Sequence, residues 1–126
     1  MANKYSAQNI AAYFIYEMNE RQAFINNEVL QHMLAQLNRV WTKHFGQSAF
    51  IEEVASPACH YAVEDVYNTY AQAGSAHIDA PAKEWTLPYG KFQLVYRTIP
   101  APKFTADELR IVSHVARQHR LLANAV

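Results

Sequence analysis

The residues that could carry chemistry begin with six histidines, the side chains that most often bind metals or transfer protons near neutral pH. His114 and His119 are five residues apart, a spacing that places them about 140° apart around a helix. His32 and His44 are twelve residues apart, and neither pair has the four-residue spacing of a helical zinc motif. The spacing predicts surface or capping histidines and no metal site.

Cysteine and carboxylate residues give no stronger sign of catalysis. Cys59 and His60 are neighbours, but adjacent residues of a helix point about 100° apart and do not form a nucleophile–base pair. A lone cysteine is more often a small buried apolar side chain. Consecutive acids also diverge, so Glu52-Glu53 and Glu64-Asp65 predict a solvated acidic patch. We therefore expect no catalytic residue, no metal and no cofactor.

Tyrosines and arginines offer two candidate binding surfaces instead. Tyr61, Tyr67 and Tyr70 recur at helical spacings. Most such rings belong to a core or its boundary, and an exposed subset would anchor a protein partner. Arg117 and Arg120 lie near the end of the expected last helix and complement its dipole. A nucleic-acid interface needs more basic residues on one face, so nucleic acid is the less favoured partner.

Composition limits the class of protein. The 126 residues are 51% hydrophobic and carry a formal net charge of zero, which favours one compact domain over residues 1–126 and no global attraction to nucleic acid. Acidic residues are in surplus over residues 51–100, and basic residues are in surplus after them. The single cysteine, the missing apolar signal core and the lack of an apolar run near ~20 residues predict a soluble cytoplasmic protein without a membrane partner.

The elements that must position these residues are mostly helices. Ser6 is a good N-cap, followed by a stripe of apolar residues, Ala7, Ile10, Ala11, Phe14 and Met18. Asn26 starts a second helix, with Ile25 and Leu30 spaced as a hydrophobic staple and Gly46 as its end. The expected core face of this helix is Leu30, Met33, Leu34, Leu37, Val40, Trp41 and His44.

Later segments predict two more helices and a hairpin. Ser56-Pro57 predicts the start of a helix that ends at Gly74, with a buried face of Val63, Val66, Tyr67 and Tyr70. Residues 85–87 and 91–96 predict two strands that lie on the helices. Thr105–Glu108 is a capping box, with Phe104 and Leu109 as its staple. The core face expected for the last helix is Leu109, Val112, Val115, Ala116 and Leu122. The predicted fold is mainly α (α+β), a compact bundle of four to five helices with a small β-hairpin.

The order and spacing of these blocks resemble the Panacea domain, a phage- and plasmid-associated family of antitoxins. The likeness covers roughly residues 6–74 and 103–120. It is carried by Asn9–Tyr16, Ile25-Asn26-Asn27, Leu30-Gln31, Met33-Leu34, Phe45-Gly46, Phe50 with Glu52-Glu53, Val63 with Val66-Tyr67, and Lys103–Glu108. The chain differs from the family at Pro57–Tyr61, where the family has an aromatic-Lys-x-Gly-Pro run, and at Ala35–Asn38, where it has Tyr-Tyr-Ala-Gln.

The resemblance implies a non-enzymatic protein that binds and neutralises a partner protein, either by masking a toxin or by delivering it to a protease. We expect the partner to meet the tyrosines and carboxylates of the central segment, Glu52, Glu53, Tyr61, Glu64, Asp65, Tyr67 and Tyr70. Two alternatives remain open. One is a phage-encoded inhibitor of a host protein on the same scaffold, favoured by the altered Pro57–Tyr61 segment. The other is a small nucleic-acid-binding regulator that uses Arg110, Arg117 and Arg120.

Overall fold

The computed structural model describes residues 4–54, 61–86, 90 and 93–124. These residues form four α-helices, one 3-10 turn and two strands, in the order α1 (Ala7–Glu20), α2 (Asn27–Phe45), α3 (Glu64–Thr69), η1 (Ala71–Ala73), β1 (Lys83–Thr86), β2 (Val95–Thr98) and α4 (Ala106–Asn124). The predicted mainly helical fold with a small hairpin is confirmed.

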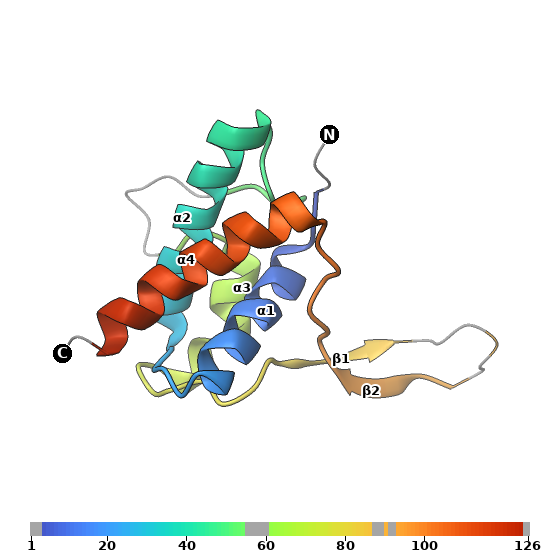
Figure 1. The fold of residues 1–126 in the computed structure, drawn as a ribbon. Coiled ribbons are helices and arrows are strands. Elements are labelled where there is room, and N and C mark those ends of the chain that lie inside the picture. Colours follow the sequence, from blue (N-terminus) through green and yellow to red (C-terminus); the bar gives the residue numbers. More distant parts are fainter. Residues whose placement is uncertain (1–3, 55–60, 87–89, 91–92, 125–126) are drawn as a thin grey trace.

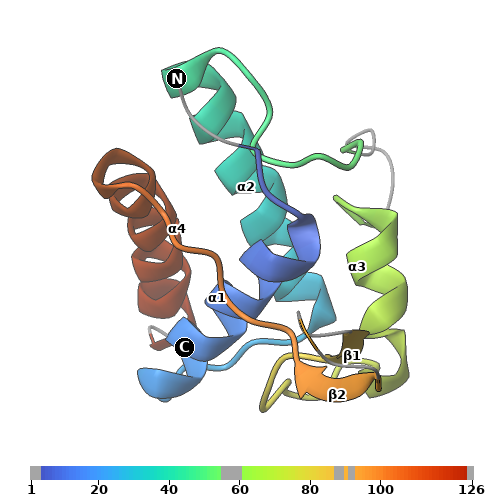
Figure 2. The same ribbon diagram turned by 90° about the vertical axis from the view of Figure 1, so that its right-hand side faces the viewer.

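Helices α1 and α2 pack together at the centre of the molecule, and the other two helices cover them from either side (Figure 1). Figure 2 shows α4 on one side of the central pair and α3 on the other. Both outer helices contact α1, and α4 also packs along α2. The sides occupied by α3 and α4 therefore face away from each other.

One apolar cluster includes residues from all four helices. The stripe predicted for α1 is confirmed, because each of its five residues is fully buried. On α2 the predicted face is buried from Leu30 to Trp41, except that Val40 is half-buried. His44 is exposed, because the last turn of α2 extends past the other helices (Figure 1). The core therefore ends one turn before the helix does.

The helix caps agree with the sequence at α2 and α4 but not at α1. The Asn26 side chain accepts a hydrogen bond from the Val29 N–H, and Gly46 closes α2 with φ 78°. The Ser6 side chain makes no capping hydrogen bond to α1. Instead, Glu52 Oε1 accepts from the Ala7 N–H at 2.9 Å. Ser6 is the N-cap residue, as predicted, but the expected capping bond to its hydroxyl is wrong, and a carboxylate from a distant segment takes that role.

Helix α4 begins with the predicted capping box. The Thr105 N–H donates to Glu108 Oε1 at 2.9 Å, and the Glu108 N–H donates to Thr105 Oγ1 at 3.3 Å. The expected staple and core position of Leu109 is wrong, because this side chain is 43% exposed. The residue next to it, Glu108, is 1% exposed and accepts a hydrogen bond from the Tyr5 hydroxyl at 2.5 Å. The turn of α4 that holds this buried carboxylate directs Leu109 to solvent. The side chain of Leu122 lies outside the described part.

Helix α3 is shorter than predicted. The expected start at Ser56-Pro57 lies outside the described residues, and the residues from Tyr61 to Val63 are not helical. The helix begins at Glu64, after Val63 in an extended conformation, and continues through η1 to Gly74 at φ 59°. Within it Val66 is fully buried, as expected. Because six residues make less than two turns, α3 depends on its neighbours for stability.

The β-hairpin forms, but it projects from the helices instead of lying on them (Figure 1). Its antiparallel register pairs Trp85 with Tyr96. Strand β1 begins two residues before the predicted 85–87, and β2 begins four residues after the start of the predicted 91–96. Residues 87, 91 and 92 of the predicted strands lie outside the described residues. Leu94 and Tyr96 are 60% and 54% exposed. The ribbon is fixed at its base, where the Ile99 N–H donates to the Ala82 carbonyl at 2.9 Å. The prediction that it packs on the helices is therefore wrong. None of the described helices has the length and apolar character needed to cross a membrane.

Candidate functional site

Helix α3 turns three different sides to its surroundings, because successive helical residues lie about 100° apart. Val66 and Tyr70 point into the apolar core. Glu64 and Asp65 line a hollow on one side of the helix, and Tyr67 lines a second hollow on another side. A short helix therefore separates two surface depressions of different composition.

The first depression, here called the acidic hollow, contains all four carboxylates that the sequence singled out. It has a volume of about 350 Å³ and is lined by Glu52, Glu53, Val63, Glu64, Asp65 and Asn68. No described lysine or arginine lines it or forms an ion pair with these carboxylates. Residues 55–60, which lie between Glu53 and Glu64 in the sequence, contain neither lysine nor arginine. The structure therefore gathers like charges from two separate segments at one place.

Two of these carboxylates also have a structural role. Glu52 accepts hydrogen bonds at the start of α1, from the Ala7 N–H at 2.9 Å and from the Ser6 hydroxyl at 3.4 Å. A negative charge at this end of a helix is stabilising, because it complements the helix dipole. Asp65 Oδ2 accepts from the Gln8 side-chain amide at 2.9 Å. Glu53, by contrast, is exposed and makes no hydrogen bond or ion pair with the described residues.

The three predicted tyrosines divide into two groups. Tyr61 and Tyr67 are half-buried, and their ring centroids are 5.5 Å apart with a tilt of 34°. Tyr70 is only 6% exposed, and its hydroxyl oxygen accepts from the Ala82 N–H at 2.9 Å. Burial raises the pKa of the Tyr70 hydroxyl. Tyr70 is therefore a core residue and does not belong to the predicted binding surface, whereas Tyr61 and Tyr67 remain accessible.

A buried glutamine fixes the segment that leads into α3. Gln31, on α2, is 3% exposed, and its Oε1 accepts from the Ala62 N–H at 2.9 Å and from the Val63 N–H at 3.2 Å. Its Nε2 donates to Asn27 Oδ1 at 3.2 Å, and Asn27 Nδ2 donates to the Tyr67 carbonyl at 3.0 Å. These bonds satisfy backbone groups that burial would otherwise leave unpaired. Helix α3 is therefore attached to α2 through side-chain-to-backbone hydrogen bonds.

Several polar residues in the segments that resemble the antitoxin family have structural roles. They cap helices or hold buried backbone groups, and they are Asn26, Asn27, Gln31, Glu52 and Glu108. A chain that needs this arrangement of helices needs these hydrogen bonds, whatever its activity. The polar residues that carry the likeness therefore stabilise the arrangement of the helices. They do not by themselves indicate a binding surface, for which charge and shape are the relevant observations.

The second depression, here called the α2 hollow, lies at the start of α2 and includes residues that the sequence did not single out as a site. It has a volume of about 530 Å³, and the polar side chains at its wall include Asn26, Asn27, Glu28, His32, Tyr67 and Ser75. Glu28 and His32 are exposed and four residues apart, so both lie on the outer side of the same helix. The four-residue spacing of Glu28 and His32 was the only sign of this site in the sequence. It does not indicate a site by itself, because Tyr67 joins these residues only in the folded chain.

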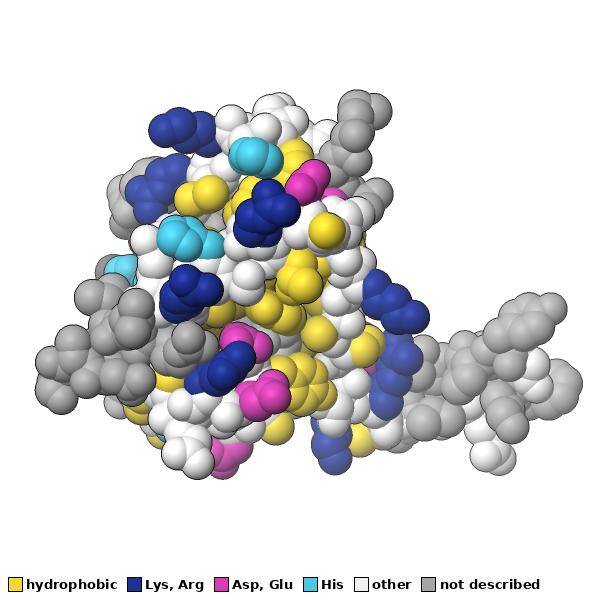
Figure 3. Space-filling view, viewed as in Figure 1, with side chains coloured by type: hydrophobic (Ala, Val, Ile, Leu, Met, Phe, Trp, Pro, Cys, Tyr) yellow, Lys and Arg dark blue, Asp and Glu magenta, His cyan; other side chains and the backbone are white. Residues whose placement is uncertain are grey.

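The side occupied by α4 is basic. Figure 3, seen from this side, shows arginine, lysine and histidine side chains over α4 and the second half of α2. The exposed cations there, here called the α4 face, are Arg39, Lys43, Arg110 and Arg117. Helix α4 continues to Asn124, so Arg117 lies well before its last turn. Its expected role in complementing the helix dipole is therefore wrong, and Arg110 pairs with Asp107 at 3.8 Å.

Two histidines that are far apart in the sequence lie near each other across α2 and α4. His119 Nε2 lies 2.6 Å from Gln36 Oε1 on α2. Burial lowers the pKa of the His119 imidazole, and the nearby His32 lowers it further. Helical spacing relates only histidines of the same helix, so the sequence could not predict that His32 and His119 lie near each other. Among the described residues no group of three or more histidine, cysteine, aspartate or glutamate side chains could hold a metal ion.

Comparisons of the chain with protein-family models, with curated proteins and with solved structures found no match. The function therefore has to be argued from the described residues. Their geometry offers two polar depressions beside α3, a pair of accessible tyrosines and a basic side opposite. Clustered carboxylates and accessible tyrosines are groups that recognise a cationic surface of another macromolecule.

Proposed function

We propose that this protein is a non-enzymatic antitoxin that binds and neutralises a partner protein. The binding surface in this proposal is the α3 face, defined as Glu52, Glu53, Tyr61, Glu64, Asp65 and Tyr67. The observation that carries the proposal is the acidic hollow, in which four carboxylates meet without a described lysine or arginine between them. The likeness to the antitoxin family adds the kind of partner, a toxin encoded beside this protein.

The physical basis is electrostatic complementarity with aromatic anchors. Like charges that line one hollow add their fields, which attracts a basic surface and raises its rate of association. Glu53 and Glu64 are exposed, so they can meet a cation without first breaking an ion pair in the described structure. Tyr61 and Tyr67 add a large contact area with few rotatable bonds. In the cytoplasm such a complex would mask the toxin or deliver it to a protease.

The proposal is tested by co-expression with the product of the adjacent open reading frame. Growth and co-purification on this protein are the two readouts. We expect a neighbour that stops growth when expressed alone, normal growth when both are expressed, and a stable complex of the two proteins. A neighbour that is harmless and does not bind would contradict the antitoxin function. A host protein that co-purifies in its place would favour the host-directed inhibitor on the same scaffold.

A second candidate function is nucleic-acid binding by the α4 face. The observation in its favour is the exposure of Arg110 and Arg117 on α4, and of Arg39 and Lys43 on α2. The α2 pair follows Gln36, which bonds to α4, at spacings of three and seven residues. Figure 3 shows basic side chains on this side of the molecule. Binding through such contacts falls steeply as the salt concentration rises, because each neutralised phosphate releases counterions. A fluorescence-anisotropy titration with a labelled DNA duplex and a labelled RNA strand at several salt concentrations measures this. No binding, or binding that does not depend on salt, would remove this candidate.

A further inference from the structure

We infer that the α2 hollow is a pocket for an arginine side chain of the protein partner. The pocket lies on the other side of α3 from the acidic hollow, so the two depressions flank the same helix. The inference rests on the proposed function, because the arginine belongs to the protein that the α3 face binds. In this inference Glu28 and Tyr67 are the groups of the α2 hollow that select an arginine side chain.

The wall of the pocket is held in shape by two asparagines. Asn26 Oδ1 accepts from the Val29 N–H at 2.9 Å, while its Nδ2 donates to the Ser75 carbonyl at 3.2 Å. Asn27 Nδ2 donates to the carbonyl of Tyr67 at 3.0 Å. Both asparagine side chains are thereby fixed, and they join the start of α2 to α3 and to the loop after η1. The depression therefore exists before a ligand arrives, which lowers the entropic cost of binding.

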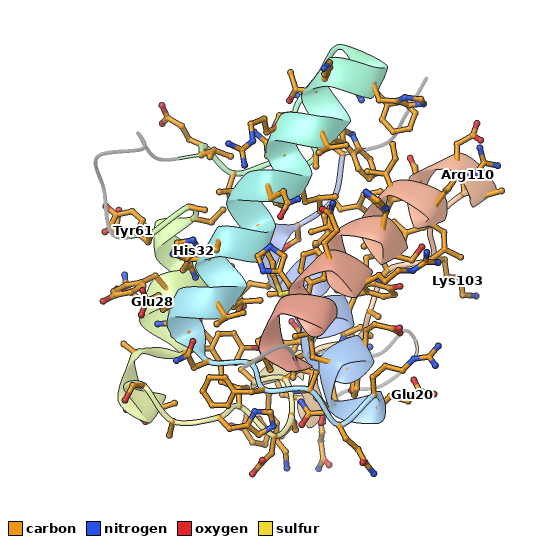
Figure 4. All side chains as sticks on the ribbon, turned by 60° about the vertical axis from the view of Figure 1, so that its left-hand side comes forward. Glu20, Glu28, His32, Tyr61, Lys103 and Arg110 are labelled. Atoms are coloured by element: carbon orange, nitrogen blue, oxygen red, sulfur yellow. The ribbon has the colours of Figure 1, made fainter. Side chains whose placement is uncertain are left out.

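The charge of the pocket selects a cation. Glu28 is exposed, and no described lysine or arginine forms an ion pair with it or lines the pocket. Figure 4 shows Glu28, His32 and Tyr61 along one side of the molecule and Lys103 and Arg110 at the other. The start of a helix would ordinarily favour an anion, but the Glu28 carboxylate already occupies that position in the first turn. An anionic ligand would be repelled by it, and a cationic ligand would be attracted.

The aromatic pair selects arginine among the cations. Tyr67 lines the pocket, and its ring is held by the neighbouring Tyr61 ring at 5.5 Å. A guanidinium group stacks on an aromatic face and forms two parallel hydrogen bonds with a carboxylate, whereas a lysine ammonium is a compact, strongly hydrated point charge. Glu28 and Tyr67 both line this pocket and offer both kinds of contact. A partner segment that crosses α3 with two basic residues would reach both hollows.

The pocket is tested by titrating the ¹⁵N-labelled full chain with N-acetyl-arginine amide and recording amide chemical shifts. The matched probe is N-acetyl-citrulline amide, which has nearly the same shape and no charge. We expect the arginine probe alone to give saturable shifts at Asn27, Glu28, His32 and Tyr67. Glu28→Gln keeps the shape of the side chain and is expected to weaken binding about fivefold. Glu20→Gln, at an exposed carboxylate on α1, is expected to leave it unchanged.

Equal shifts with both probes, or shifts confined to the acidic hollow, would overturn the arginine pocket. So would a Glu28→Gln protein that binds the arginine probe as tightly as the unmodified chain. Growth rescue by the adjacent gene product separates this result from the proposed function. Growth rescue without binding of the arginine probe would overturn the arginine pocket and support the antitoxin function. Binding of the probe without growth rescue would support the pocket and contradict the antitoxin function.

Discussion

The α3 face and the α4 face differ in charge, in shape and in the way each is held. Helix α3 has six residues and α4 has nineteen. The first is attached through Gln31, which accepts from the Ala62 N–H just before the helix, and through Asn27 and Gln8, which donate to the Tyr67 carbonyl and the Asp65 carboxylate. The second is held by buried apolar residues, Val112, Val115 and Ala116, and begins with its own capping box. Carboxylates line hollows on one face, and separate cations stand along the other.

This difference shows where a binding surface can be recognised. A long amphipathic helix carries exposed charges as an ordinary consequence of having a solvated side. The cations of the α4 face fit that description, and one of them, Arg110, pairs with Asp107 one turn earlier in the helix. A six-residue helix has no such need, yet α3 contributes two of the four carboxylates that line the acidic hollow, and none of the four forms an ion pair with a described lysine or arginine. The proposed binding surface therefore rests on the combination of a hollow with carboxylates that have no described ion pair, and not on the number of charges.

The largest effect on stability is predicted for a substitution that removes the hydrogen bonds attaching α3 to α2. Gln31→Leu would leave the Ala62 and Val63 N–H groups buried without an acceptor. Each such group costs about 1–3 kcal/mol, partly offset by the added apolar side chain, so we expect a loss of about 3 kcal/mol in the free energy of unfolding. Urea unfolding followed by circular dichroism measures this.

The matched variant lies five residues further along α2, on the side of α4. Gln36 bonds to Gln118 and His119, in partly exposed surroundings where water can replace it. Gln36→Leu is expected to cost less than about 1 kcal/mol. Equal losses in the two variants would show that the two faces are held alike and would contradict the comparison.

A smaller effect separates two adjacent carboxylates of the acidic hollow. Glu52→Ala removes the acceptor for the Ala7 N–H at the start of α1 and is expected to cost about 1 kcal/mol. Glu53→Ala removes an exposed side chain without a partner among the described residues and is expected to change stability by less than about 0.5 kcal/mol. The midpoints of thermal unfolding of both variants measure this. A destabilising Glu53→Ala would mean that the hollow is structural.

The smallest effect concerns pH and the α4 face. The folded state lowers the pKa of His119 below its usual value of about 6.5, so the folded protein binds fewer protons there than the unfolded chain. This stability is present above the unfolded pKa and is lost as the pH falls through 6.5 towards the lowered value. Gln36, Gln118 and His32 are the groups around this imidazole.

His119→Gln should therefore flatten the fall in stability between about pH 7.5 and pH 5.5. Ser113→Ala, at a side chain of the same helix that does not titrate, is the control and should leave the slope unchanged. Unfolding free energies at a series of pH values measure both slopes. A steeper fall in the His119→Gln protein would contradict the direction of the pKa shift.

The fold was largely predictable where the signal is local. Asn26 and Gly46 bound α2, and Thr105 starts α4, because a capping residue acts on backbone groups within four positions of itself. The cap of α1 was not predictable, since its acceptor, Glu52, is 45 residues away from Ala7. The outward direction of the hairpin also depends on tertiary contacts, because two short strands carry no information on where they pack.

The sequence predicted most residues of the proposed binding surface, but it did not predict the hollows that they line. Glu52, Glu53, Glu64 and Asp65 were recognisable as acidic pairs, and only the folded chain brings the pairs to one hollow. Periodicity placed Tyr67 and Tyr70 on one helix side, although α3 directs Tyr70 inwards and Tyr67 to the α2 hollow. Glu28 and His32 become candidates only in the folded chain, where they line one hollow together with Tyr67.

The central claim is that the α3 face, and not the α4 face, binds the partner. The most direct test is isothermal titration of the partner that co-purifies with this protein against two charge-reversal variants. Glu53→Lys with Glu64→Lys should weaken binding at least about tenfold, because two like charges would then face a basic surface. Arg110→Glu with Arg117→Glu should change the affinity by less than about twofold. A larger loss of affinity in the Arg110→Glu, Arg117→Glu variant than in the Glu53→Lys, Glu64→Lys variant would contradict this claim.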